Sequence, residues 1–268
     1  MGLPIFTADD VIGFSGAIDR LGCAIVRNAL PVPFLASYAD GIARCHDYLE
    51  GVVEAGLERL GAREPATSQT LEAKRRQSGF SLSFRLNYEL QMPAHVQQIF
   101  QVIRDSPLLG LAGSVFGRRA AILTDNCSAR LQRPREPDRG LALHQDVVAA
   151  GITAPQQQGL TFWIPLNALD GRAPTLEVLP LRFREILPHR YDERAYAVLE
   201  SQDEWREAIG ASLQPVDDMR PGDVLVFTSY TIHGTRIGPD VDRSRYSLDI
   251  RCRPLDEVAA SYGGTLMF

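Results

Sequence analysis

The sequence is poor in cysteine. Only four cysteines occur in 268 residues, they lie far apart, and none forms a C-x-x-C pair. A disulfide framework is therefore not expected, and each thiol is expected to act as a small buried hydrophobe in a reducing compartment. The four are Cys23, Cys45, Cys127 and Cys252.

Long apolar runs and excess positive charge are lacking too. No stretch approaches the roughly 18 apolar residues of a membrane-spanning helix. The first residues have no basic segment followed by an apolar run, so no signal peptide is expected, and Phe6 stands where a myristoylation motif needs serine or threonine. The net charge of −5 and the pI of about 5.6 argue against a surface built for nucleic acid or an anionic membrane. We expect a cytoplasmic protein without either partner.

Apolar residues make up 45% of the chain, which is enough for one large core. The first 117 residues are predicted to be largely helical, because their apolar residues recur every three or four positions. The elements predicted here are helices over 7–22 and 33–60, one or two helices over 94–116 with a break near Ser106-Pro107, strands over 23–26 and 81–90, and a mobile loop over 62–79.

Residues 118–268 consist of short β-rich segments separated by glycine and proline. Such a pattern is typical of an antiparallel sandwich or barrel. A segment at about 182–215, which contains Trp205, has helical spacing and is predicted to be an insertion. No repeat or linker divides the chain, so a single domain over 1–268 is expected. The predicted strands are Ala120–Thr124, Ser128–Gln132, Leu141–Asp146, Leu160–Leu166, Thr175–Leu179, Asp223–Phe227 and Ser244–Cys252.

Histidine is scarce, with five residues, and two of them belong to one pattern. His144 and Asp146 are two positions apart, so on a strand both point to the same face. Together with His233 they make two histidines and one carboxylate, the ligand set of non-haem iron(II) oxygenases. Gly234 follows His233 and is expected to allow a sharp turn and leave room near a metal. The alternatives are a polar pair at a strand end and a hydrogen-bonded core histidine.

A second polar pattern follows at residues 245–251. Period-two alternation places Arg245, Ser247, Asp249 and Arg251 on one face of the predicted strand. Arginines on an inward face need anionic partners, since an unpaired buried guanidinium is costly. An external dicarboxylate would be such a partner, held in bidentate fashion with help from the serine hydroxyl. The alternative is a set of salt bridges on an exposed strand.

Four motifs occur in a fixed order: H-x-D at 144–146, G-D at 222–223, H-G at 233–234 and R-x-S at 245–247. Together they resemble the Fe(II)/2-oxoglutarate-dependent oxygenases, and within these the phytanoyl-CoA dioxygenase family. Residues 21–31 are similar to that family's opening glycine and strand, and residues 160–166 to its strand after the H-x-D loop. One departure is Leu-Pro-Leu-Arg at 179–182, where the family often has Pro-Gly-Ser-His.

The resemblance implies a mainly β fold with flanking helices, built on a double-stranded β-helix (a cupin-like jelly roll). Iron(II) would lie at its open end, with His144, Asp146 and His233 as ligands. Arg245 would hold the distal carboxylate of 2-oxoglutarate, helped by Ser247. Arg243 is the rival for this role, because the spacing from histidine to arginine varies in such enzymes.

Further polar residues are candidates for binding the co-substrate. Gln132 matches a position where the family often places such a contact, and Ser128 and Arg130 share its face. Thr161 is another candidate. For these four residues the alternative is ordinary strand polarity.

The implied activity is oxidation of an unactivated C–H bond of a small molecule, with O2 consumed and 2-oxoglutarate converted to succinate and CO2. Asp146 stands where related halogenases have a small residue, so oxygen transfer or desaturation is expected. The alternatives are an oxidative nucleic-acid dealkylase and a non-oxygenase metal-binding β-barrel. Trp163 and Phe84 are candidates for the cavity wall, or else core residues. No motif names the substrate or the oligomeric state. Specificity is expected in residues 62–90, 147–158 and 182–215.

Overall fold

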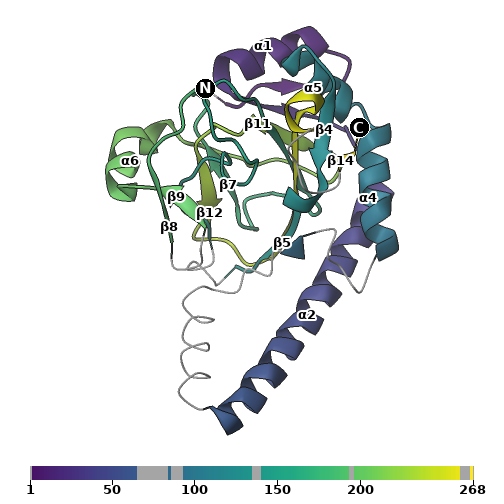
Figure 1. The fold of residues 1–268 in the computed structure, drawn as a ribbon, viewed down its shortest axis with the longest axis vertical. Helices are drawn as coiled ribbons and strands as arrows, with labels where there is room; N and C mark the ends of the chain where they lie inside the picture. Colours follow the sequence, from purple (N-terminus) through teal and green to yellow (C-terminus); the bar gives the residue numbers. More distant parts are fainter. Residues whose placement is uncertain are drawn as a thin grey trace.

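A large β-sheet forms the centre of the protein (Figure 1). The computed structural model describes residues 2–64, 84–85, 93–134, 140–192, 196–259 and 266–267. Within them, nine strands belong to this sheet. Its main path is β1 (Ile5–Phe6), β2 (Cys23–Val26), β11 (Val224–Thr228), β6 (Leu160–Pro165), β13 (Arg245–Pro254), β4 (Ala120–Leu123) and β14 (Leu266–Met267). Strand β5 (Ser128–Gln132) pairs with β13, and β3 (Phe84–Arg85) pairs with β5.

Two smaller sheets complete the described strands. One has the order β10 (Gln214–Pro215), β7 (Thr175–Val178) and β12 (His233–Arg236), and all its pairs are antiparallel. The other is an antiparallel hairpin of β8 (His189–Tyr191) and β9 (Ala197–Leu199).

Helices cover one face of the large sheet (Figure 1). The first begins where the Asp10 carboxylate accepts a hydrogen bond from the Gly13 N–H, and it ends at Gly22, whose φ is +76°. The helices are α1 (Val11–Leu21), α2 (Val32–Arg63), α4 (Pro93–Asp105), α5 (Leu108–Phe116), α6 (Gln202–Ile209) and α7 (Leu255–Val258), with short 3-10 segments at Thr124–Asn126 and Gly210–Ser212. No helix in the described ranges is long and apolar enough to cross a membrane.

Alternation along the strands sorts the side chains of the large sheet. On β2, Ala24 and Val26 face the helices, whereas Cys23 and Ile25 face the small sheet. The outer cluster includes residues from the helices, such as Phe14 of α1, and apolar residues of six strands of the large sheet. The inner cluster joins the large sheet to Leu176 and Val178 of β7. The β10–β7–β12 sheet therefore packs on the face opposite the helices. The described helices that precede residue 117 contribute to one core with the large sheet.

The same alternation gives β13 two different faces. Leu248, Ile250 and Cys252 belong to the helix-covered core, while the intervening polar residues point between the two sheets. The predicted polar face of this strand is confirmed, and it points inward.

Three predictions of local structure were wrong or incomplete. Residues 141–146 do not form a strand: only His144 makes a β-bridge, with His233. The segment 182–215 is not simply helical, because the β8–β9 hairpin precedes α6. The first helix begins at Val11, not at residue 7, because Asp10 rather than Thr7 caps it. Most of the predicted loop at 62–79 and strand at 81–90 lies outside the described residues.

Candidate metal centre

Three buried side chains meet between the large sheet and the β10–β7–β12 sheet. His144, Asp146 and His233 each offer one ligand atom, and these atoms all lie within 4.8 Å of one another. His144 Nε2 is 3.9 Å from Asp146 Oδ1, and the two imidazole centroids are 4.1 Å apart. Two nitrogens and one oxygen on one side leave the opposite side open for further ligands.

Backbone hydrogen bonds hold the two histidines side by side. The His144 N–H donates to the His233 carbonyl at 2.9 Å, and the His233 N–H donates to the His144 carbonyl at 3.1 Å. Gly234 permits this approach, since a Cβ there would lie 3.3 Å from the Leu141 carbonyl oxygen and 3.3 Å from Leu143 Cδ2. The room that Gly234 leaves therefore faces the chain before His144. The expected sharp turn is absent, because Gly234 lies within β12 and does not have a positive φ.

Both imidazoles present a lone pair to the centre. Nδ1 of His144 is 2.8 Å from the Ala142 carbonyl oxygen, and Nδ1 of His233 is 3.0 Å from that of Thr231. A carbonyl oxygen only accepts, so each Nδ1 carries the proton and each Nε2 is left to bind a metal. Burial, with the neighbouring His233, lowers the pKa of His144 to about 3, and burial also lowers the pKa of His233. The two rings are therefore neutral at pH 7.

Two partners hold the Asp146 carboxylate. The Arg251 guanidinium donates to Oδ1 at 3.0 Å, and the Thr161 hydroxyl donates to Oδ2 at 2.7 Å. Burial alone would raise the pKa of Asp146, but Arg251 and the two histidines outweigh it and hold the pKa well below its usual range. Asp146 is thus an anion at pH 7. Each of its oxygens keeps a lone pair for a metal.

A second buried ion pair lies on the same face of β13. The Arg130 guanidinium binds the Asp249 carboxylate, which also accepts a hydrogen bond from the Ser128 hydroxyl at 3.0 Å. Burial opposes the charge of Asp249, yet Arg130 and Arg251 lower its pKa. Asp249 therefore uses Arg130 as its partner.

Arg245 differs from these arginines because it has no carboxylate partner among the described residues. Its guanidinium donates to the Thr175 carbonyl at 3.2 Å and lies over the Trp163 ring, 5.6 Å from the centroid. Its Nε and the nearby Ser247 hydroxyl are buried without a hydrogen bond. Burial lowers the pKa of Arg245 to about 10, so it remains a cation at pH 7. A buried cation with unused donors fits an external anion.

Two adjoining cavities open at the centre. The first, which we call the Arg245 cavity, also contains Gln132, paired across the sheet with Arg245. The second, which we call the hairpin cavity, shares Arg130, His144 and Asp146 with it, as well as Leu141 and Arg251. The Arg245 cavity is also lined by Leu131, Trp163, Leu176, Phe227, His233, Thr235 and Asp249. The hairpin cavity is also lined by Asn126, Cys127, Ser128, Gln145, Val148, Ala149, Tyr191, Tyr196 and Ala197.

The structure separates the predicted site residues into two groups. Gln132 and Arg245 lie in the first cavity with the three candidate ligands, and Trp163 forms part of its wall. Thr161 binds Asp146. Arg243 lies on the surface, where it forms an ion pair with Asp170. Arg243 is thus remote from the position expected of a co-substrate clamp, because a nearby acid on the surface holds its guanidinium.

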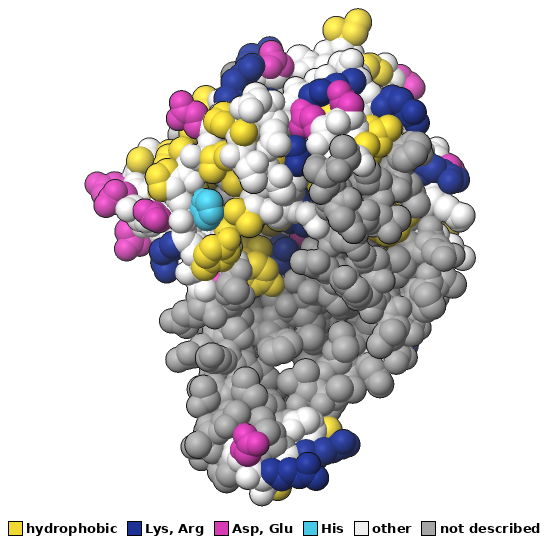
Figure 2. All heavy atoms as spheres, viewed as in Figure 1, with side chains coloured by type: hydrophobic (Ala, Val, Ile, Leu, Met, Phe, Trp, Pro, Cys, Tyr) yellow, Lys and Arg dark blue, Asp and Glu magenta, His cyan; other side chains and the backbone are white. Residues whose placement is uncertain are grey.

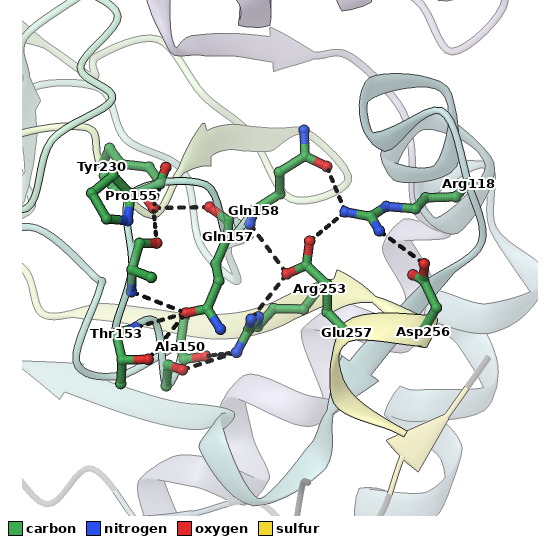
Figure 3. Close-up of polar contacts among 12 residues, drawn as sticks. Arg118, Ala150, Thr153, Pro155, Gln157, Gln158, Tyr230, Arg253, Asp256 and Glu257 are labelled. Carbon is green, nitrogen blue, oxygen red and sulfur yellow. Dashed lines mark hydrogen bonds and ion pairs between the residues drawn. The ribbon is translucent and has the colours of Figure 1, made fainter. Parts of the chain in front are cut away.

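The loop that follows Asp146 is fixed by a hydrogen-bond network (Figure 3). The Arg253 guanidinium donates to the carbonyls of Ala150 and Gly151 and binds Glu257 at 3.0 Å. Glu257 in turn binds Arg118, as Figure 3 shows. Farther along the loop, the Tyr230 hydroxyl lies within hydrogen-bond distance of the carbonyls of residues 154, 155 and 157.

Sequence patterns did not identify the contribution of the β8–β9 hairpin. Tyr191 and Tyr196 line the second cavity, but neither belongs to a recognisable motif. The pairing of Arg251 with Asp146 was missed as well. Alternation had placed Arg251 on the inward face, and that signal was the only one available for it.

None of the protein-family models matches this sequence, and no curated protein matches it either. Solved structures match over most of the chain. SnoK, a non-haem α-ketoglutarate-dependent carbocyclase from nogalamycin biosynthesis, has a TM-score of 0.56 at 14% identity, covering 94% of this chain and 87% of that chain. EctD from S. alaskensis, solved with 2-oxoglutarate and 5-hydroxyectoine, has a TM-score of 0.55 at 16% identity, covering 90% of this chain and 75% of that chain.

A third structure is the epimerase SnoN, solved with Fe3+, α-ketoglutarate and nogalamycin RO. Its TM-score is 0.54 at 15% identity, and the match covers 92% of this chain and 84% of that chain. At this level of identity the likeness shows a shared fold. It is a mainly β fold with flanking helices, as expected from the sequence.

Proposed function

We propose that the protein is a non-haem iron(II)- and 2-oxoglutarate-dependent oxygenase that oxidises a C–H bond of a small molecule. The observation that carries this proposal is the meeting, in one cavity, of a His-Asp-His group and a buried arginine that has no carboxylate partner among the described residues. The whole chain would act as one domain with a jelly-roll core, similar to the phytanoyl-CoA dioxygenase family. The shared fold with SnoK, EctD and SnoN supports this proposal.

The residues present fit iron(II). Two neutral imidazole nitrogens and one carboxylate oxygen match the facial ligand set of non-haem iron oxygenases. The hydrogen bonds that orient these ligands are present too, since the two Nδ1 atoms bind backbone carbonyls and the carboxylate binds Arg251 and Thr161. In this proposal His144, Asp146 and His233 hold the metal.

The residues present also fit a dicarboxylate. The Arg245 guanidinium would bind the distal carboxylate of 2-oxoglutarate, and the Ser247 hydroxyl would supply a hydrogen bond. The Trp163 ring lies beside the guanidinium and favours its charge there. Gln132 stands across from Arg245 and offers an amide to the same ligand. Charge and unused donors thus coincide in this cavity.

When bound, iron(II), 2-oxoglutarate and O2 would supply oxidation of a C–H bond, with 2-oxoglutarate converted to succinate and CO2. The chain would hold the three ligands, exclude bulk water and position the substrate. Because Asp146 is a carboxylate, it would occupy the place that a halide would need. Oxygen transfer or a related oxidation is therefore proposed.

The test is an anaerobic titration with iron(II) and 2-oxoglutarate, monitored by visible absorption. We expect a weak charge-transfer band that appears only when both are present, and succinate after air is admitted. Metal binding without the band and without succinate would instead indicate a non-oxygenase metal protein.

A further inference from the structure

The hairpin cavity differs in charge from the Arg245 cavity beside it. Every arginine among its described lining residues is already paired: Arg130 with Asp249, and Arg251 with Asp146. The acid among these lining residues is Asp146, and its charge is balanced by Arg251. The described walls therefore offer no uncompensated charge to a ligand, whereas the Arg245 cavity offers one cation.

The β8–β9 hairpin supplies the aromatic wall of this cavity. Tyr191 lies on β8 and is 62% exposed, while Tyr196 directly precedes β9. Val148 also lines this cavity and is a large apolar residue, 40% exposed. Figure 2 shows hydrophobic side chains gathered on this face of the molecule, next to β8 and β9. Exposed apolar groups that meet at one cavity are typical of a ligand-binding surface.

The base of the hairpin is joined to the residue before the first candidate ligand. The Leu199 N–H donates to the Leu143 carbonyl at 2.9 Å, and the Gln202 side chain binds both the N–H and the carbonyl of Leu143. Leu143 and Leu199 also share one apolar cluster. Because Leu143 precedes His144, the hairpin has a fixed position relative to the metal centre.

Tyr196 contacts Arg130, a residue that lines both cavities. The Arg130 guanidinium lies over the Tyr196 ring, 5.8 Å from the centroid. The Tyr196 N–H also donates to the Asp192 carboxylate at 2.9 Å, which fixes the chain near the hairpin turn. The hairpin thus holds an aromatic ring at a defined place beside Arg130.

From these contacts we propose that the β8–β9 hairpin is the specificity wall for the primary substrate, and that the substrate presents an uncharged ring there. Tyr191 and Tyr196 bind this ring by stacking, which needs no charge on the ligand. The placement of the reacting C–H near iron rests on the proposed function. The preference of the cavity for an uncharged ring does not depend on the proposed function.

The test uses 2-naphthol, a neutral bicyclic ring, and 2-naphthoate, which carries a carboxylate on the same ring. Both are titrated calorimetrically into the full chain loaded with cobalt(II) and saturated with 2-oxoglutarate, so that Arg245 is occupied. We expect 2-naphthol to bind and 2-naphthoate to bind at least about tenfold more weakly. We expect Tyr191→Ala and Tyr196→Ala to weaken 2-naphthol binding by about fivefold each.

Two further variants guard against a folding artefact. Tyr196→Phe keeps the ring and should bind 2-naphthol like the unsubstituted protein. Ile12→Ala changes a residue that is 89% exposed on α1 and lines neither cavity, so it should have no effect. Equal binding of both probes, no binding of 2-naphthol, or unchanged binding in both tyrosine-to-alanine variants would overturn the proposal. Failure of 2-oxoglutarate to bind, with 2-naphthol binding retained, would count against the proposed function instead.

Discussion

The guanidinium of Arg251 on β13 lies 3.0 Å from the Asp146 carboxylate, and both side chains are less than 10% exposed. The pair joins the large sheet to the loop that carries two of the three candidate ligands. Thr161 on β6 approaches the other oxygen of the same carboxylate. Asp146 is therefore held in place by the sheet before any metal binds.

Replacing Arg251 by glutamine should weaken metal binding. The substitution leaves a buried carboxylate without its cation, which costs about 3–5 kcal/mol in the metal-free protein. Loss of a contact that orients a ligand typically lowers metal affinity about 10- to 100-fold. The measurements are denaturant unfolding of the metal-free protein and cobalt(II) titration against a competing chelator. Thr161→Val, which removes one hydrogen bond, should also lower the stability and the cobalt(II) affinity, but by less than Arg251→Gln. Equal cobalt(II) affinity in Arg251→Gln and the unsubstituted protein would contradict this role.

Strand alternation predicted the face of β13 on which Arg245, Ser247, Asp249 and Arg251 lie, because a buried sheet fixes the direction of every second side chain. It could not predict which ion pairs these residues form. Asp249 binds Arg130 of β5, and Arg251 binds Asp146 of the loop before β6; both partners are distant in the sequence. Charge pairing between remote segments leaves no periodic signal.

The predicted strand at 141–146 failed for a different reason. The backbone groups of Leu143 bind the Gln202 side chain and the Leu199 N–H, so they are not available to a neighbouring strand. His144 and Asp146 nevertheless reach one centre, because a single bridge to His233 is enough to place the first of them. The pattern of residue types predicted which three side chains meet, whereas its assumed backbone geometry was wrong.

Replacing Arg245 by glutamine should weaken 2-oxoglutarate binding, and replacing Arg243 should not. Arg245 is 3% exposed and lacks a carboxylate partner among the described residues, whereas Arg243 binds Asp170 on the surface. Removing a charged hydrogen-bond donor from a buried site costs about 1.5–3 kcal/mol, or roughly 10- to 150-fold in affinity. Calorimetric titration of the cobalt(II)-loaded protein with 2-oxoglutarate measures this loss of affinity. Arg243→Gln is the matched control, and a larger loss in that variant would reverse the assignment.

The metal-free protein should lose stability as the pH falls from 7 toward 4. The pKa of His144 is lowered to about 3 in the folded state, against about 6.5 in an unfolded chain. Between these values the unfolded chain binds a proton that the folded chain does not, so stability is fully present above about pH 6.5 and declines below it. The lowered pKa of His233 has the same sign.

Denaturant unfolding of chelator-treated protein at pH 7, 6 and 5 measures this dependence. The variant His144→Gln has no imidazole at this position, so its unfolding free energy should change less over the same range. An identical pH slope in the two proteins would show that His144 is not buried as a neutral base.

Substitution of Gly234 should disturb the centre through the backbone alone. Alanine at this position would place its Cβ 3.3 Å from the Leu141 carbonyl oxygen, closer than such contacts usually come. Valine adds two methyl groups in the same space and should push the chain before His144 away from β12. The paired hydrogen bonds between His144 and His233 would lengthen, and the two Nε2 atoms would no longer suit one metal ion.

We therefore expect Gly234→Val to lower the free energy of unfolding by about 1–3 kcal/mol, the usual cost of overpacking. Cobalt(II) affinity should fall as well, although the substitution touches no candidate ligand. Gly234→Ala should give a smaller loss of both. Gly16→Ala is the control, because a Cβ at Gly16 of α1 meets nothing within 4 Å. If Gly234→Val lost stability but kept its cobalt(II) affinity, the bridge between the two histidines would not be what fixes the distance between them.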